Sequence, residues 1–182
     1  MKPLRVVVTG SECTGKTTLA RALAARFDAP YVPELCRGYQ DSRGRPLVAT
    51  DVEPIARGQI AEADEAEERA TRLLVLDTDL VSTVVYARHY YGQCPSWVEE
   101  AARRRRADLY LLCTPDLKWE ADSQRDRGDR REEMHRLFAE ALAGIGAEVR
   151  FVTGSGPNRE KAATAAVADA LAKRSHHLSS AS

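Results

Sequence analysis

Short apolar runs alternate along the chain with longer segments whose apolar residues recur at helical spacing. Five runs are typical of buried strands, because they are brief, continuous and rich in valine and leucine. They cover residues 4–8, 31–33, 73–76, 108–113 and 148–152. Strands that alternate with helices favour an α/β fold with one doubly wound, mostly parallel sheet of five strands and helices on both faces. In such a sheet, ligands lie at the carboxyl ends of the strands.

The segments between these runs predict the helices. They are expected over 17–27, about 51–72, 80–91, from Pro95 or Ser96 to 106, 132–144 and 157–173. Residues 38–49 contain glycine, proline and short polar residues and predict a loop. Thr50 followed by Glu53 is typical of a capping box at a helix start. We expect a single domain over residues 1–174 and a polar, disordered tail over 175–182.

The first strand leads into a glycine-rich loop with the pattern G-x-x-x-x-G-K-T, which is that of the phosphate-binding P-loop. The residues expected to bind the nucleotide are Gly10, Ser11, Glu12, Cys13, Thr14, Gly15, Lys16, Thr17 and Thr18. Glycines allow a tight turn that brings backbone N–H groups close to phosphate oxygens. The lysine reaches the β- and γ-phosphates, and the threonine hydroxyl is a Mg²⁺ ligand. The order of strand, loop and helix is the context this motif requires, and it indicates ATP binding with Mg²⁺.

Composition and charge exclude several classes of function. The 182 residues include 27 basic and 27 acidic side chains, so no basic excess points to nucleic acid or a membrane surface. Four cysteines lie far apart without a C-x-x-C pair, which favours reduced thiols in a cytoplasmic protein. The first apolar run is short and leads directly into the loop, so we expect neither a signal peptide nor a membrane span. The sequence pattern does not indicate the oligomeric state.

Carboxylates follow two of the strands. Asp77 ends an apolar run, the placement of the aspartate that holds Mg²⁺ in P-loop proteins. Asp79 points to the same side if the strand continues, where it is a candidate base for the acceptor hydroxyl, and otherwise it caps the next helix. Glu34 follows the second strand and can accept a proton from a hydroxyl, with Arg37 keeping it ionised. The alternative for Glu34 and Arg37 is a structural ion pair.

The segment 118–131 is densely charged and predicts an arginine-rich lid over about residues 117–131. Arg125 and Arg130 are candidates to close onto the phosphates, unless the segment is an ordinary charged surface loop. Trp119 can stack on a flat base, and a core position is the alternative.

Together these stretches resemble the ribosylnicotinamide kinase domain of NadR-type proteins, a branch of the P-loop nucleoside and nucleotide kinases. The similar blocks are G-S-E-C-T-G-K-T-T-L-A (10–20), Y-V-P-E-L-C-R (31–37), D-T-D-L (77–80), D-L-Y-L-L (108–112) and D-L-K-W-E-A-D-S-Q-R-D-R-G-D-R (116–130). The resemblance extends over about residues 4 to 155. It implies phosphorylation of the 5′-hydroxyl of nicotinamide riboside by ATP and Mg²⁺, which gives nicotinamide mononucleotide for NAD salvage.

The resemblance also implies roles for particular residues. Beyond the phosphate loop they are Glu34, Arg37, Asp77, Asp79, Trp119, Asp122, Arg125 and Arg130. Lys118 stands where the family has proline and Ser123 where it has glycine, which alters lid stiffness and acceptor fit. We expect a kinase without the adenylyltransferase domain that precedes the kinase domain in the fused proteins.

Two other functions fit the same pattern. One is a kinase of this architecture for another nucleoside, a nucleotide or a cofactor precursor. The other is an ATP-dependent switch or ATPase without a small-molecule acceptor. An arginine-rich lid that excludes water favours a kinase over a switch.

Overall fold

A five-stranded parallel sheet forms the centre of the molecule, and the computed structural model describes residues 2–116 and 130–179. Its strands are β1 (Leu4–Thr9), β2 (Tyr31–Val32), β3 (Leu73–Asp77), β4 (Leu109–Cys113) and β5 (Val149–Val152). They lie in the order β2-β3-β1-β4-β5, and each hydrogen-bonded pair is parallel. The prediction of a doubly wound parallel sheet is therefore confirmed, with β1 in its centre.

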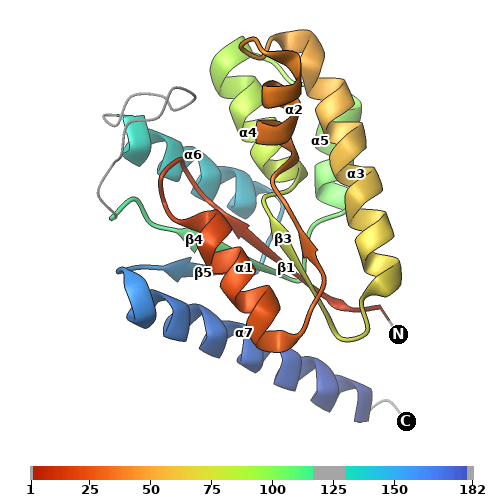
Figure 1. The fold of residues 1–182 in the computed structure, drawn as a ribbon, viewed down its shortest axis with the longest axis vertical. Helices are drawn as coiled ribbons and strands as arrows, with labels where there is room; N and C mark the ends of the chain where they lie inside the picture. The colour runs from red at the N-terminus through yellow and green to blue at the C-terminus, as the bar shows by residue number, and fades with distance from the viewer. Residues whose placement is uncertain (1, 117–129, 180–182) are drawn as a thin grey trace.

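Helices cover both faces of this sheet (Figure 1). Helices α1 (Lys16–Phe27) and α7 (Gly156–Ser179) pack on one face. The other face carries α3 (Val52–Arg69), α4 (Leu80–Tyr91), α5 (Ser96–Arg104) and α6 (Arg131–Gly144). Helix α2 (Leu35–Arg43) and a short 3-10 turn, η1 (Ala49–Asp51), connect β2 to α3. The chain thus forms three layers, and the loop after β1 opens at the carboxyl edge of the sheet.

The core follows from the two-residue alternation of strand side chains. In β1, Val7 faces the layer of α3 to α6, whereas Val6 and Val8 face α1 and α7. All three valines are fully buried, as are Tyr110 and Phe138 on the α6 side. A continuous apolar run is needed in β1 because neither face of this strand meets water.

Residues 35–43 form a helix, so the prediction of a loop from residue 38 was wrong. Gly38 is exposed within α2, where a single glycine costs about 1 kcal/mol relative to alanine and does not break the helix. The Ser42 hydroxyl bonds to the Tyr39 carbonyl one turn back. The helix ends at Gly44, whose φ of 60° is the left-handed conformation of a helix C-terminus. The turn signals in this segment mark the end of a helix.

The start of α3 and the end of α7 also differ from expectation. The Asp51 carboxylate, and not Thr50, accepts the hydrogen bond from the Val48 N–H that opens the turn before α3. Helix α7 continues through the expected tail to Ser179. Arg174, immediately before the expected tail, donates to the Lys2 carbonyl at 2.7 Å and pairs with Asp108 at 3.2 Å. These contacts join the last turns of α7 to the start of the chain and to the residue before β4.

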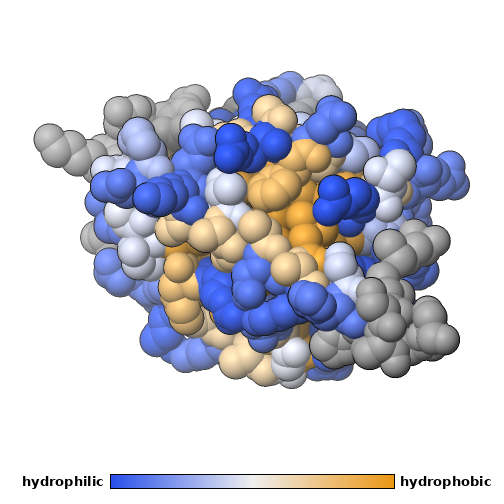
Figure 2. Space-filling view, turned by 90° about the horizontal axis from the view of Figure 1, so that it is seen from below, coloured by the Kyte–Doolittle hydropathy of each residue, from blue (hydrophilic) through white to orange (hydrophobic). Residues whose placement is uncertain are grey.

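Apolar surface is limited in the described residues. Seen from below, apolar side chains gather near the centre of that face and hydrophilic ones border them (Figure 2). The large apolar side chains that remain exposed in the described part of the chain are Val48, Tyr90 and Phe151. Within the same residues, no helix has both the length and the apolar character that crossing a membrane requires.

Candidate active site

The phosphate loop joins β1 to α1 at the carboxyl edge of the sheet. Gly10 has a φ of 136°, and a Cβ there would lie 2.8 Å from the Cys113 carbonyl oxygen on β4. Only glycine allows this approach, so the first glycine of the motif is required by the neighbouring strand. Gly15, with a φ of 73°, precedes the first residue of α1. The backbone N–H groups of the loop and the positive end of the α1 dipole therefore serve one anion-binding site.

Two side chains of the motif stabilise the loop from within. The Lys16 ammonium donates to the Ser11 carbonyl at 2.9 Å, and the Thr14 hydroxyl donates to the same oxygen at 2.8 Å. Lys16 is only 8 % exposed, so its charge is held in a region of low dielectric. A buried cation beside loop N–H groups is the arrangement that binds a polyphosphate.

Asp77 ends β3 beside the loop, as the sequence predicted, and is 1 % exposed. Its Oδ2 accepts a hydrogen bond from the Tyr31 hydroxyl at 3.3 Å, and its buried Oδ1 has no hydrogen-bond partner. Burial, followed by the charge of Glu34, raises the pKa of Asp77, while the Thr17 hydroxyl and the Lys16 charge act against the increase. A buried carboxylate oxygen left open beside Thr17 suits a bound cation.

The described residues contain no cluster of three histidine, cysteine or carboxylate side chains able to hold a metal ion alone. Mg²⁺ characteristically takes one or two protein ligands and completes its shell with water and substrate phosphates. Thr17 and Asp77 supply that number, so the residues present fit a magnesium ion shared with a nucleotide.

A groove of about 410 Å³ lies next to the phosphate loop, and Glu12 of the loop forms part of its wall. Glu34 and Arg37, at the start of α2, line the groove without forming an ion pair with one another. Three tyrosines of α4 also line the groove, Tyr86, Tyr90 and Tyr91. Val48 and Tyr90, two of the exposed apolar side chains, lie here, so the exposed apolar surface includes part of a concave site.

Carboxylates outnumber cations among the residues that line the groove. Burial raises the pKa of the Tyr86 hydroxyl well above its usual value, and the charges of Glu12 and Glu34 add to the increase. Burial together with Glu34 and Glu12 raises the pKa of the Cys36 thiol to about 11. The charge of Glu34 also raises the pKa of Asp77, so these two carboxylates interact.

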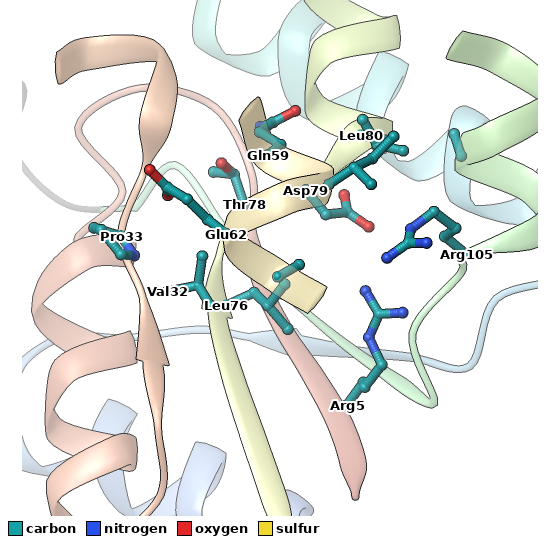
Figure 3. Close-up of a pocket in the computed structure, with 13 residues that line it drawn as sticks. Arg5, Val32, Pro33, Gln59, Glu62, Leu76, Thr78, Asp79, Leu80 and Arg105 are labelled. Carbon is teal, nitrogen blue, oxygen red and sulfur yellow. The ribbon is translucent and has the colours of Figure 1, made fainter. Parts of the chain in front are cut away.

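Asp79 does not join this groove. Its carboxylate accepts the Val81 N–H at 3.0 Å and the buried Tyr110 hydroxyl at 2.7 Å. It points toward Arg5 and Arg105 in a separate cavity of about 20 Å³ (Figure 3), and burial raises its pKa.

The expectation that Asp79 shares a side with Asp77 fails because β3 ends at Asp77. Thr78 adopts a φ of 68°, which breaks the two-residue alternation of the strand. Asp79 caps α4 instead, which was the alternative left open for it.

The arginine-rich segment is described only at its end. Trp119, Asp122 and Arg125 lie outside the described residues. Arg130 is exposed immediately before α6. The next residue, Arg131, reaches the phosphate loop and donates to the Cys13 carbonyl at 3.3 Å.

Arg159 is a site residue that the sequence pattern did not identify. From the first turns of α7 its guanidinium donates to the Thr14 carbonyl at 2.8 Å and to the Gly154 carbonyl at 2.6 Å. It also bonds the Thr114 carbonyl at 3.3 Å and the Asp116 carboxylate at 2.8 Å. One signal was available, since a cation near a helix N-terminus opposes the helix dipole and needs another reason to be there.

Asp116 is the carboxylate partner of this arginine. Burial acts to raise its pKa, but hydrogen bonds from the Gly154 N–H, Thr114 and Arg159 outweigh burial and hold the pKa below its usual value. The carboxylate therefore remains ionised and keeps the buried arginine paired.

A central β1 that leads into a phosphate loop, beside a β3 that ends in a buried aspartate, defines a P-loop protein built like the nucleoside and nucleotide kinases. The model of a family described as AAA domain matches residues 5–159. The chain belongs to this family.

Curated relatives give a narrower similarity. The chain is 32% identical over 143 residues to the trifunctional NAD biosynthesis/regulator protein NadR of Escherichia coli K12, and 30% identical to that of Salmonella typhimurium. Each match covers 75% of this chain and 35% of the relative. The chain thus spans about a third of the length of the curated relatives it matches.

Solved structures agree with this similarity. A NadR protein in complex with NR matches 93% of this chain at a TM-score of 0.81 and 27% identity, over 52% of its own chain. A NadR protein in complex with NAD and AMP-PNP also matches 93% of this chain, at a TM-score of 0.80 and 27% identity, over 50% of its own chain. Thymidylate kinase from Ehrlichia chaffeensis, at a TM-score of 0.66 and 12% identity, covers 94% of this chain and 100% of its own and shares the fold.

Proposed function

We propose that this chain is an ATP- and Mg²⁺-dependent kinase that phosphorylates the 5′-hydroxyl of nicotinamide riboside. The observation that carries the proposal is the junction of two sites. The phosphate loop and Asp77 would form a donor site, and Glu12 of the loop lines, together with Glu34, a groove of about 410 Å³ that can hold a nucleoside. A kinase requires this arrangement, because both substrates must meet in line at one phosphorus atom.

The donor half would hold ATP on the loop N–H groups, with Lys16 on the β- and γ-phosphates. Thr17 and Asp77 would hold Mg²⁺, which would supply positive charge to neutralise the phosphates. Lys16 supplies a fixed positive charge without reorganisation, since it is already buried at the loop.

The acceptor half rests on Glu34. Glu34 lines the groove that Glu12 of the phosphate loop also lines, and its carboxylate could accept the proton of a primary hydroxyl bound there. The carboxylate of Asp79 is held by Val81 and Tyr110, which leaves Glu34 as the better candidate for the base. Arg37 in the same groove is available to bind the acceptor.

The chemistry of the groove suits the base of nicotinamide riboside. Nicotinamide attached to ribose is a flat ring with a positive charge. Tyrosine faces attract such a ring by cation–π interaction, and the neighbouring Glu12 and Glu34 carboxylates favour a cation over a neutral base. The similarity to a NadR protein that was solved with NR supports the same acceptor.

A coupled assay of ADP release tests the proposal. The purified chain, with ATP and Mg²⁺, is given nicotinamide riboside, common nucleosides, nucleoside monophosphates and small vitamins in parallel. We expect turnover with nicotinamide riboside and a product with the mass of nicotinamide mononucleotide. The Lys16→Ala variant is the control, and its turnover should be lower by about 10²–10³-fold, as for loss of one preorganised charge.

Other results of this assay would favour one of the two alternative functions, a kinase for another acceptor or an ATP-dependent switch. Turnover only with a different acceptor would leave the chain a kinase and reject nicotinamide riboside. ATP hydrolysis that no acceptor changes, together with ATP-dependent association with another protein, would identify a switch.

A further inference from the structure

Two arginines from distant segments hold the outer side of the phosphate loop. Arg131, at the start of α6, donates to the Cys13 carbonyl, and Arg159 of α7 donates to the Thr14 carbonyl. The Arg159 bond is the shorter of the two, at 2.8 Å against 3.3 Å. Arg159 therefore restrains the loop more closely.

The Thr14 carbonyl matters because of the geometry of its peptide unit. In a planar trans peptide, the C=O of one residue and the N–H of the next point in opposite directions. The Thr14 carbonyl shares its unit with the N–H of Gly15, a residue of the phosphate-binding motif. When Arg159 holds the carbonyl outward, the Gly15 N–H is turned away from it, toward the inside of the loop. A loop N–H oriented in this way is a phosphate donor.

Arg159 is itself held rigidly. Its side chain is 5% exposed and is paired with Asp116 at 2.8 Å. The other contacts are the Gly154 carbonyl before α7 and the Thr114 carbonyl after β4. The guanidinium thus fastens the phosphate loop to the ends of β4 and β5 through one planar group.

We propose that Arg159 is a positioning residue for the nucleotide: it orients the Thr14–Gly15 peptide so that the loop is shaped for phosphate before ATP binds. This role rests on the proposed use of the loop for ATP. It does not depend on the acceptor, because the contacts lie on the donor side of the sheet.

The chain contains a matched control. Arg174, also in α7, donates to the Lys2 carbonyl at 2.7 Å and pairs with Asp108. It makes the same types of contact as Arg159, but at the amino end of the sheet. Replacement of either arginine should lower the stability of the protein. Only replacement of Arg159 should also lower the affinity for the nucleotide.

The test measures ADP binding with Mg²⁺ by titration calorimetry, without acceptor, for the wild type and for Arg159→Met, Arg159→Lys and Arg174→Met. Urea unfolding of each ligand-free variant gives its stability. We expect Arg159→Met to weaken ADP binding about tenfold to a hundredfold, the range for loss of a charged hydrogen-bond group. The ADP affinity of Arg159→Lys should lie between those of wild type and Arg159→Met, because an ammonium keeps the charge but lacks the planar guanidinium. Arg174→Met should lose stability and bind ADP within about twofold of wild type.

Equal ADP affinity in folded Arg159→Met and wild type would overturn the proposal. A loss of ADP affinity in Arg174→Met as large as that in Arg159→Met would overturn it as well. If Arg159→Met does not fold, Arg159→Lys decides by the same comparison. Weaker ADP binding in the Arg159 variants with no turnover of nicotinamide riboside by wild type would reject the acceptor and keep this role for Arg159.

Discussion

Glu34 and Asp79 are the two carboxylates that the sequence offered as a base, and their surroundings differ. Glu34 is half-buried at the edge of the groove, whereas Asp79 is a helix cap bonded to Val81 and Tyr110. A base must reach the proton that it removes, so accessibility distinguishes the two. Asp79 is instead expected to stabilise the start of α4.

We predict that Glu34→Gln loses most of its turnover and retains affinity for an ATP analogue. The amide keeps the shape of the side chain but cannot accept the proton of the acceptor. Steady-state kinetics and analogue titration measure the two quantities on one preparation.

Asp79→Asn is the matched variant. It should lower the free energy of unfolding and leave the turnover of the folded protein near that of wild type. If Asp79→Asn lost turnover as fully as Glu34→Gln without a change in stability, the base would be Asp79.

At the scale of elements, α2 and the turn before α3 form one wall of the groove. Arg45 pairs with Asp51 through two hydrogen bonds of 2.7 and 2.9 Å, which fixes the loop between α2 and η1. Pro46, Leu47 and Val48 of that loop line the groove. Hydrogen bonds from Arg45 and from the Val48 N–H lower the pKa of Asp51 to about 2.

This pKa gives a pH dependence with a definite sign. Because folding lowers the pKa of Asp51, its ionised form stabilises the native state above the ordinary aspartate pKa of about 3.9. That contribution is lost as the pH falls through about 2. We predict that Asp51→Ala is less stable than wild type at neutral pH and that the difference shrinks as the pH falls from about 4 toward 2.

Urea unfolding of both proteins across this pH range measures the difference. Glu68→Ala, at an exposed position of α3, is the control for a general effect of removing an acid. A difference between Asp51→Ala and wild type that stayed constant down to the lowest pH would contradict the assignment of the low pKa to the Arg45 pair.

For the whole molecule, the phosphate loop passes close to β4 at Gly10 and is hydrogen-bonded to α7 through Arg159. A ligand on the loop therefore binds the folded state alone and shifts the unfolding equilibrium. We predict that an ATP analogue with Mg²⁺, at a hundred times its dissociation constant, raises the free energy of unfolding by about 2.7 kcal/mol. Chemical denaturation with and without ligand measures the shift.

Lys16→Ala at the same ligand concentration is the control, and its shift should be much smaller because its affinity is lower. An equal shift in the two proteins would mean that the analogue binds away from the loop.

Much of the architecture was predictable from local pattern. The continuous apolar runs indicated the strands, and helix α4 was expected over 80–91, where it is found. Gly92 ends α4 in the left-handed conformation that is typical of a helix C-terminus. The loop motif identified the donor site because its chemistry depends on residues that are neighbours in the chain.

The sequence by itself determined the parallel α/β sheet, the phosphate loop with Lys16 and Thr17, and the strand that carries Asp77. These features depend on contacts over a few residues and on the burial of continuous apolar runs, which a linear pattern records. Tertiary structure decided the direction of Asp79, because the φ of Thr78 ends the strand alternation. It also decided the role of Arg159, because that arginine meets the loop only after the sheet brings the ends of β1, β4 and β5 together.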